Sequence, residues 1–140
     1  MSKIEIMPFD NKKIEALHKV GIVGEHFLMH VHGKYEIYVS VSGNSKYFIG
    51  QKIYDVDPYD VFLFNNTDVH RIHTYDAAAY ERYVIMFPPD VLSKFDEETT
   101  SLLRIFETEK ASRVHKLKLP KPQINEFLGI VKKLIACNTD

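Results

Sequence analysis

The sequence contains little of what marks secreted or membrane proteins. One of its 140 residues is a cysteine, Cys137, so no disulfide can form within the chain. No apolar run is long enough to cross a bilayer, and the first residues, MSKIEIMPFDNKK, lack the apolar core and cleavage site of a signal peptide. We therefore predict a reduced, cytoplasmic protein with no membrane segment.

Concentrated positive charge is missing as well. The formal net charge is −1, and no run of Lys or Arg is longer than two residues. Proteins that hold a phosphate backbone usually carry a basic patch, because neutralising the phosphates supplies much of the affinity. We therefore expect that this chain by itself does not bind DNA.

Aromatic residues are plentiful, with eight Tyr and nine Phe but no Trp. They lie in short, often alternating segments that are separated by turn residues, which is typical of strands in a sandwich or barrel. The predicted strands span residues 27–32, 35–42, 46–49, 52–56, 61–64, 69–75 and 80–87. The sequence therefore predicts a mainly β protein of one domain.

The pattern changes after residue 88. Short helical pieces are predicted at 90–95 and 99–109, and one more strand at 113–119. From residue 120 on, apolar residues recur at helical spacing: Ile124, Phe127, Leu128, Val131, Leu134 and Ile135. We divide the chain into a barrel with a helical insert, residues 1–119, and an amphipathic helix, residues 120–140. The apolar stripe of this helix either packs on the barrel or forms a dimer seam.

Five residues form the candidate site. His30 and His32 alternate along a predicted strand and so share a face, while Glu36 and Tyr38 share a face of the next strand. His70 begins a later strand, from which it would join them. Imidazole and carboxylate groups hold divalent ions such as Zn, Ni, Mn or Fe, and with a tyrosine they also hydrogen-bond to polar ligands. We therefore predict a small-molecule ligand at all five residues and, as an alternative, a metal at His30, His32, Glu36 and His70.

Three other histidines are weaker candidates for a binding site. His18, His26 and His115 have no partners at ligand spacing. A lone histidine is most often a surface or structural residue. We predict those roles here.

The residues Gly24, His30, His32, Glu36 and Gly43 have the identities and the spacing of the first cupin motif, which the sequence therefore resembles. The resemblance implies a double-stranded β-helix barrel over about residues 18 to 87. It also implies that His30, His32, Glu36 and His70 line the interior at the positions of the cupin metal ligands.

The second cupin motif is present in spacing but altered in composition. Its positions fall on Tyr59, Asn65, Thr67, His70 and Thr74. The histidine is kept, whereas the usual Gly, Pro, Gly and Asn are replaced.

Nearly the whole chain also resembles the N-terminal sensing domain of AraC-type transcription regulators. The segments that carry this resemblance are His30 to His32, Tyr35 to Tyr38, the Gly43 turn, Tyr47 to Ile49, Pro58 to Asp60, Val69 to Arg71, and Tyr80 to Arg82 leading to Phe87. This family usually has Gly-Asp where the chain has Tyr59-Asp60. The resemblance implies a small effector in the barrel, often a sugar, and a homodimer formed through the C-terminal helix. It also implies a helix-turn-helix DNA-binding domain that is absent from this chain, which we expect to be an excised sensing domain.

Three functions remain as interpretations of the sequence. The first is a non-enzymatic effector-binding and dimerisation domain that requires no cofactor. The second is a small metal-dependent cupin enzyme, such as a dioxygenase or isomerase, in which the four ligands leave open positions for substrate. The third is a barrel that serves only for dimerisation. The AraC-type segments favour the first.

Overall fold

The computed structural model describes residues 4–7, 14–21, 29–93, 104–107 and 114–137. Within these residues the structure has ten strands and three helices. The strands are β1 (Ile4–Met7), β2 (Glu15–Val20), β3 (Met29–His32), β4 (Tyr35–Ser40), β5 (Ser45–Ile49), β6 (Lys52–Val56), β7 (Val61–Phe64), β8 (His70–Thr74), β9 (Glu81–Phe87) and β10 (Lys116–Leu117). The helices are α1 (Pro89–Ser93), α2 (Arg104–Glu107) and α3 (Lys121–Cys137).

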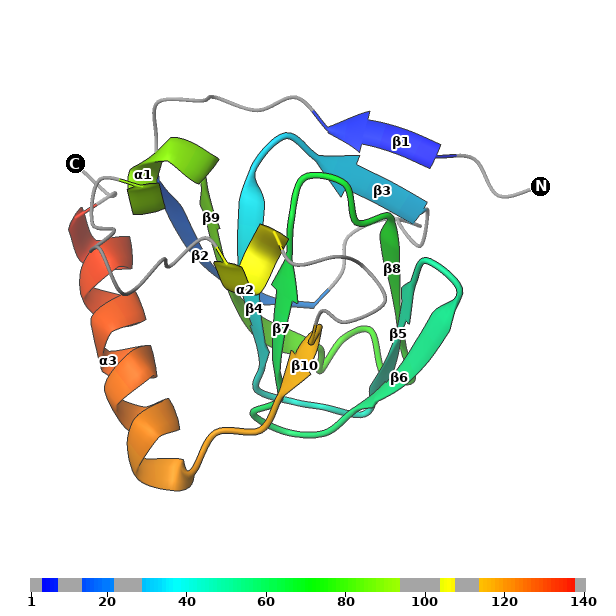
Figure 1. Ribbon diagram of the computed structural model, residues 1–140. Coiled ribbons are helices and arrows are strands. Elements are labelled where there is room, and N and C mark those ends of the chain that lie inside the picture. The colour runs from blue at the N-terminus through cyan, green and yellow to red at the C-terminus, as the bar shows by residue number, and fades with distance from the viewer. Residues whose placement is uncertain (1–3, 8–13, 22–28, 94–103, 108–113, 138–140) are drawn as a thin grey trace.

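The described strands form two five-stranded sheets that face each other and enclose a barrel (Figure 1). Sheet A has the order β1-β3-β8-β5-β6, and sheet B has the order β10-β7-β4-β9-β2. Neighbouring strands are antiparallel except β1, which runs parallel to β3. The prediction of a mainly β barrel followed by a C-terminal helix is confirmed.

Sheet B separates two hydrophobic clusters, because successive side chains of a strand point to opposite faces. The inner cluster fills the space between the sheets and consists of Tyr38, Tyr47, Ile49, Val56, Phe62, Phe64 and Tyr80. The outer cluster includes Tyr35, Val39, Val61, Leu63, Tyr83, Ile85 and Phe87 from sheet B, together with residues of the helices. The predicted parity of β4 is therefore correct: Tyr38 faces inward, and Val39 faces the helices.

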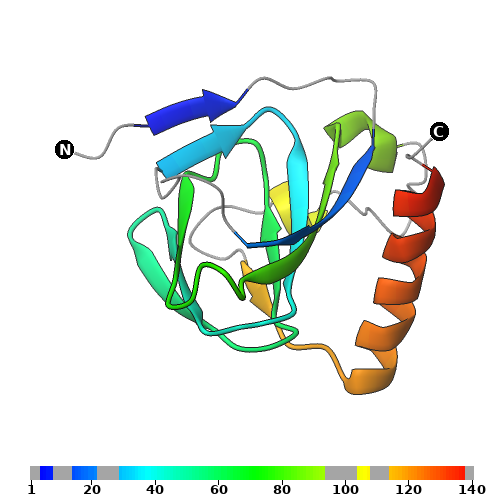
Figure 2. The same ribbon diagram turned by 180° about the vertical axis from the view of Figure 1, so that it is seen from behind.

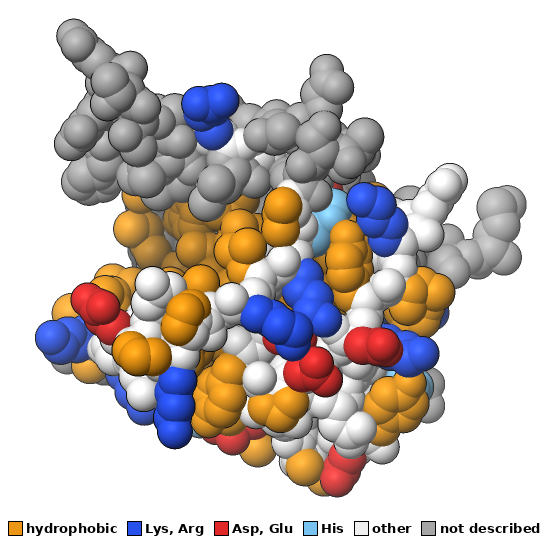
Figure 3. Space-filling view, turned by 60° about the horizontal axis from the view of Figure 1, so that its bottom comes forward, with side chains coloured by type: hydrophobic (Ala, Val, Ile, Leu, Met, Phe, Trp, Pro, Cys, Tyr) orange, Lys and Arg blue, Asp and Glu red, His pale blue; other side chains and the backbone are white. Residues whose placement is uncertain are grey.

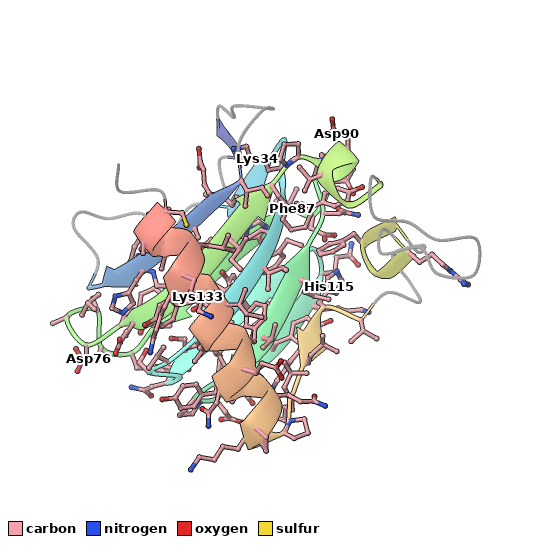
Figure 4. The ribbon with its side chains drawn as sticks, turned by 90° about the vertical axis from the view of Figure 1, so that its left-hand side faces the viewer. Lys34, Asp76, Phe87, Asp90, His115 and Lys133 are labelled. Carbon is pink, nitrogen blue, oxygen red and sulfur yellow. The ribbon has the colours of Figure 1, made fainter. Side chains whose placement is uncertain are left out.

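Helix α3 lies across the outer face of sheet B, as Figure 2 and Figure 4 show from different sides. Its buried residues are Ile124, Leu128 and Val131, which belong to the outer cluster, whereas Lys133 is exposed. The predicted apolar stripe thus packs on the barrel, which is the first of its two interpretations. Ile130, 52% exposed, remains at the surface of the helix. None of the helices in the described part of the chain is long and apolar enough to span a membrane.

The strands β1 and β2 were not expected from the sequence. Both are short, and each is stabilised by pairing with a distant segment: β1 with β3, and β2 with β9. The described part of the predicted segment 99–109 forms α2, and the rest of that segment lies outside the described residues. The described part of the predicted segment 113–119 forms a shorter strand than expected, β10. The residues at which an element begins and ends depend on non-local contacts, which sequence periodicity does not predict.

Candidate ligand-binding site in the barrel interior

Glu36 and His70 meet inside the barrel. Glu36 lies in β4 of sheet B, and His70 begins β8 of sheet A. Glu36 Oε2 lies 3.4 Å from His70 Nε2, and both side chains are buried. The two predicted site residues are therefore brought together from different sheets, as the proposed interior site requires.

The environment of His70 determines how its ring is presented. Its Nδ1 lies 2.9 Å from the backbone carbonyl oxygen of Asp68. A carbonyl can only accept a hydrogen bond, so Nδ1 carries a proton and donates it. The ring also stacks on Phe64, with the centroids 4.0 Å apart and the planes 12° apart. The ring is thus held in a defined orientation with Nε2 directed at Glu36.

The backbone places His30 in β3 directly opposite His70 in β8. The side chains of His30 and His32, two of the predicted ligands, lie outside the described residues. Among the side chains that are described, no group of three or more His, Cys, Asp or Glu residues could hold a metal ion.

Tyr38, the remaining predicted site residue, forms a hydrogen bond with Tyr80, which was not among the predicted site residues. The hydroxyl oxygens of Tyr38 and Tyr80 are 2.6 Å apart in the interior. The ring of Tyr47 stands nearly perpendicular to that of Tyr38, with the centroids 5.0 Å apart. Around Tyr38 the inward face of β4 therefore meets aromatic rings, with polar groups among them.

Burial keeps these phenols neutral. Burial, with a further contribution from Tyr80, raises the pKa of Tyr38 well above its ordinary value of 10.0. Burial likewise raises the pKa of Tyr47, and it raises the pKa of Tyr80 to about 12. The guanidinium carbon of Arg82 lies 4.2 Å from the centroid of the Tyr80 ring and opposes part of that rise. The interior tyrosines therefore act as neutral groups that can donate and accept hydrogen bonds.

These shifts predict a loss of stability at alkaline pH. Tyrosines of an unfolded chain release their protons near pH 10, whereas Tyr38, Tyr47 and Tyr80 keep theirs to higher pH in the folded protein. The contribution of these groups is complete below about pH 10 and is lost as the pH rises through their folded pKa values. Urea unfolding between pH 9 and 12 would measure the loss of stability, and tyrosinate absorbance would follow the ionisation of the phenols. Each unit of pKa difference between the folded and unfolded states corresponds to about 1.4 kcal/mol of unfolding free energy.

A conservative variant pair provides the control. Tyr47→Phe removes one buried phenol and should make the alkaline loss less steep, whereas Tyr75→Phe removes an exposed one and should leave it unchanged. If all eight tyrosines ionised together near pH 10 in the folded protein, the assignment of neutral phenols to the interior would be wrong.

The altered second motif has a structural consequence in the turn between β7 and β8. Asn65 Oδ1 accepts hydrogen bonds from the amide and the hydroxyl of Thr67, each 2.8 Å long. Asn65 Nδ2 donates to the carbonyl oxygen of Phe106 in α2. The Asp68 carboxylate accepts a hydrogen bond from the backbone N–H of Asn65. Side-chain hydrogen bonds therefore hold the turn where the motif usually has proline and glycine.

The other departure lies at Tyr59, where the AraC-type family usually has glycine. Tyr59 has a φ of 68°, in the left-handed region that glycine adopts without steric cost. The position therefore has a backbone conformation that favours glycine, and the non-glycine residue is strained by about 1–2 kcal/mol.

Two of the remaining histidines have the predicted roles. His18 lies at the surface with Nε2 2.7 Å from Glu81 Oε2. His115 is buried, with Nδ1 3.2 Å from the hydroxyl of Tyr54 and Nε2 3.5 Å from Asp68 Oδ1. His26 lies outside the described residues. Sequence reasoning did not identify Asp68, Tyr80 and Arg82 as neighbours of the site. Periodicity predicts which face of a strand a residue lies on, but it does not predict which turns and strands come together in the fold.

Comparison with known proteins gives a family match. The family model described as "AraC-like ligand binding domain" matches residues 15–129. No curated protein sequence matches the chain. Among solved structures, the chain is similar to a Cupin 2 conserved barrel domain protein from Salinispora arenicola, with 19% identity and a TM-score of 0.44. That similarity covers 64% of this chain and 76% of the other.

Proposed function

The chain belongs to the family of AraC-like ligand-binding domains, and from this premise we propose that it is the effector-sensing domain of an AraC-type transcription regulator. The effector would bind in the barrel, beside Glu36, Tyr38, His70 and the predicted residues His30 and His32. The observation that supports this most directly is the buried contact between Glu36 and His70 across the two sheets. Polar side chains that converge inside an otherwise apolar interior are the usual feature of a small-molecule site, which supports ligand binding here.

The chemistry of the interior suggests the class of effector. A carboxylate accepts hydrogen bonds from hydroxyl groups, and neutral phenols both donate and accept them. The rings of Tyr47, Phe62 and Phe64 pack against one another next to these polar groups and make the rest of the interior apolar. A small molecule with several hydroxyl groups and an apolar face, such as a sugar, combines both requirements.

A thermal-shift measurement with a panel of pentoses, hexoses and sugar alcohols would test this proposal. One member should raise the melting temperature, because a ligand that binds the folded state stabilises it by mass action. The shift should be lost in Glu36→Gln and in Tyr38→Phe. It should be kept in His18→Gln, which removes a histidine–carboxylate pair at the surface. A shift of equal size in all four proteins would place the ligand elsewhere.

Within the same proposal, effector binding regulates a cytoplasmic homodimer that contacts DNA through a separate helix-turn-helix domain. The dimer would form through exposed residues of α3, because three residues of its apolar stripe are buried against the barrel. The effector can shift the equilibrium between two arrangements only through different affinities for them.

The purified 140-residue chain is expected not to bind a promoter fragment, with or without effector. Its net charge of −1 and its lack of basic runs give no electrostatic attraction to phosphate. A gel-shift titration at low salt, where non-specific binding is strongest, would measure this. Sequence-specific retardation by this chain alone would contradict the assignment of DNA binding to another domain.

A divalent ion is not required by the proposal, but the hydrogen bonding of His70 is compatible with one. Metal-bound histidines usually donate their other ring N–H to a carbonyl or carboxylate, as His70 does to Asp68. Glu36 and His70 would hold the ion together with the predicted His30 and His32. When bound, the ion would supply a positive charge that stabilises the buried carboxylate.

Metal content separates the sensor from the alternative, a metal-dependent cupin enzyme. Elemental analysis of protein purified without chelators or a metal-affinity step should find no stoichiometric Fe, Mn or Ni if the domain is a sensor. A stoichiometric redox metal that is lost in Glu36→Gln would favour the enzyme.

A further inference from the structure

The buried Glu36–His70 pair is connected to the segment that leads into α3. The connection begins at Asp68, in the turn before β8, whose backbone oxygen accepts the hydrogen bond from His70 Nδ1. The carboxylate of the same residue makes separate contacts. Its Oδ1 is 3.5 Å from Nε2 of His115, and its Oδ2 accepts a hydrogen bond of 2.9 Å from the backbone N–H of Asn65. One buried residue thus contacts both histidines.

His115 directly precedes β10 and fastens it to the barrel. Its backbone oxygen accepts a hydrogen bond of 2.8 Å from the amide of Leu63 in β7. Its ring lies between Asp68 and the Tyr54 hydroxyl and is almost fully buried. Figure 4 shows His115 beside β7, above β10. A displacement of its ring would therefore act on the attachment of β10 to sheet B.

The residues after His115 are anchored by charge. The Lys116 ammonium donates to the Asp55 backbone oxygen at 2.7 Å. Lys118 contacts both Asp57 and Asp60, at 3.1 and 2.8 Å, and these two hydrogen bonds raise its pKa. Basic side chains lie beside acidic ones on the bottom face of the molecule, as Figure 3 shows. Helix α3 begins at Lys121, three residues further on.

We propose that Asp68 is a positioning residue that couples the Glu36–His70 pair to residues 115–118 and through them to α3. The proposal rests on the proposed sensing function and describes the regulation of that site. A ligand that draws His70 or Glu36 into a new arrangement changes the hydrogen bond at the Asp68 carbonyl. Because the carbonyl and the carboxylate belong to one short residue, a change at the carbonyl alters the position of the carboxylate and its contact with His115. A change in the Glu36–His70 pair thereby alters the contacts of the segment that joins the barrel to α3.

Hydrogen exchange of the Leu63 amide provides a direct readout, because this amide donates to His115. Glu36→Gln, which perturbs the interior, is expected to change the exchange rate of Leu63 by about threefold or more, as local opening of β10 responds. In an Asp68→Asn background the same change should fall to less than about 1.5-fold. His115→Gln offers a second background for the case in which Asp68→Asn does not fold. The ring nitrogen shifts of His115 should also move in Glu36→Gln.

His18→Gln is the matched control, because it removes a histidine–carboxylate contact that is not connected to residues 115–118. It should leave the Leu63 rate and the His115 shifts unchanged. The proposal is overturned if Glu36→Gln moves neither readout, if its effect is the same in both backgrounds, or if all amides of sheet B change equally. No effector is needed, so failure of this coupling and failure of effector binding would be seen in separate experiments.

Discussion

Gly43→Ala is expected to destabilise the protein by about 2–5 kcal/mol, from left-handed strain and overpacking together. Gly43 has a φ of 60°, which costs an alanine energy wherever it occurs. In addition, a Cβ at this position would lie 2.5 Å from Cδ and N of Pro58 and 2.7 Å from the Asp57 carbonyl carbon. Backbone cannot yield as the end of a flexible side chain can, so the turn would have to shift.

Two other glycines separate these contributions. Gly50 has a φ of 57°, but a Cβ added there would have no atom within 4 Å, so Gly50→Ala should cost only the conformational part, about 1–2 kcal/mol. Gly129 lies inside α3 with the same free space, so Gly129→Ala should stabilise by about 1 kcal/mol. Urea unfolding of the three variants measures all of these contributions. A loss in Gly43→Ala no larger than that in Gly50→Ala would contradict the close approach to Pro58.

The Gly43 turn matters for the site because it joins the two strands that carry Tyr38 and Tyr47. The Gly43 amide donates to Ser40 Oγ, and the Ser45 hydroxyl donates to the Gly43 carbonyl. Ser40, which was expected to hydrogen-bond to a ligand, is thus used in the turn. A shifted turn should therefore weaken effector binding as well as stability.

Phe64→Ala is the second large effect, with an expected loss of about 3–5 kcal/mol. The Phe64 ring is fully buried and contacts Tyr47 and His70 inside the barrel. Its removal leaves a cavity beside the His70 ring and frees that ring to turn. We therefore expect this variant to lose any effector-induced thermal shift, in addition to its lower melting temperature.

Phe48→Ala is the control of the same residue type. Phe48 is partly exposed, and the Arg71 guanidinium carbon lies 4.5 Å from the centroid of its ring. Loss of such a contact costs about 1 kcal/mol. Urea unfolding and the thermal shift together should show a small loss with the effector response kept. If both variants lost similar stability and kept the response, Phe64 would not be supporting the site.

The sequence predicted those parts of the fold that depend on local alternation. The alternation in β4 predicts that Glu36 and Tyr38 share a face, and both are buried in the structure. The resemblance to the cupin motifs implies that His70 lies in the same interior as Glu36, and the two side chains are in contact. The first feature follows from strand periodicity, whereas the second depends on the resemblance.

The features that could not be predicted arise from closure of the barrel. Tyr80 meets Tyr38, and His115 meets Asp68, across 42 and 47 residues of chain. Neither contact has a periodic or motif signal, because each depends on how the two sheets and the C-terminal segment pack. The same holds for the pairing of β1 with β3. The polar partners of the site are therefore a result of tertiary structure.

The central claim is that the barrel interior around Glu36, Tyr38 and His70 receives the effector. Amide chemical shifts of the labelled protein, recorded while a stabilising sugar or sugar alcohol is added, test it most directly. We expect shift changes that concentrate at β4, β8 and the start of β9 and that disappear in Glu36→Gln. Changes confined to the outer face of α3 or to the exposed ends of the strands, or none with any member of the panel, would contradict it.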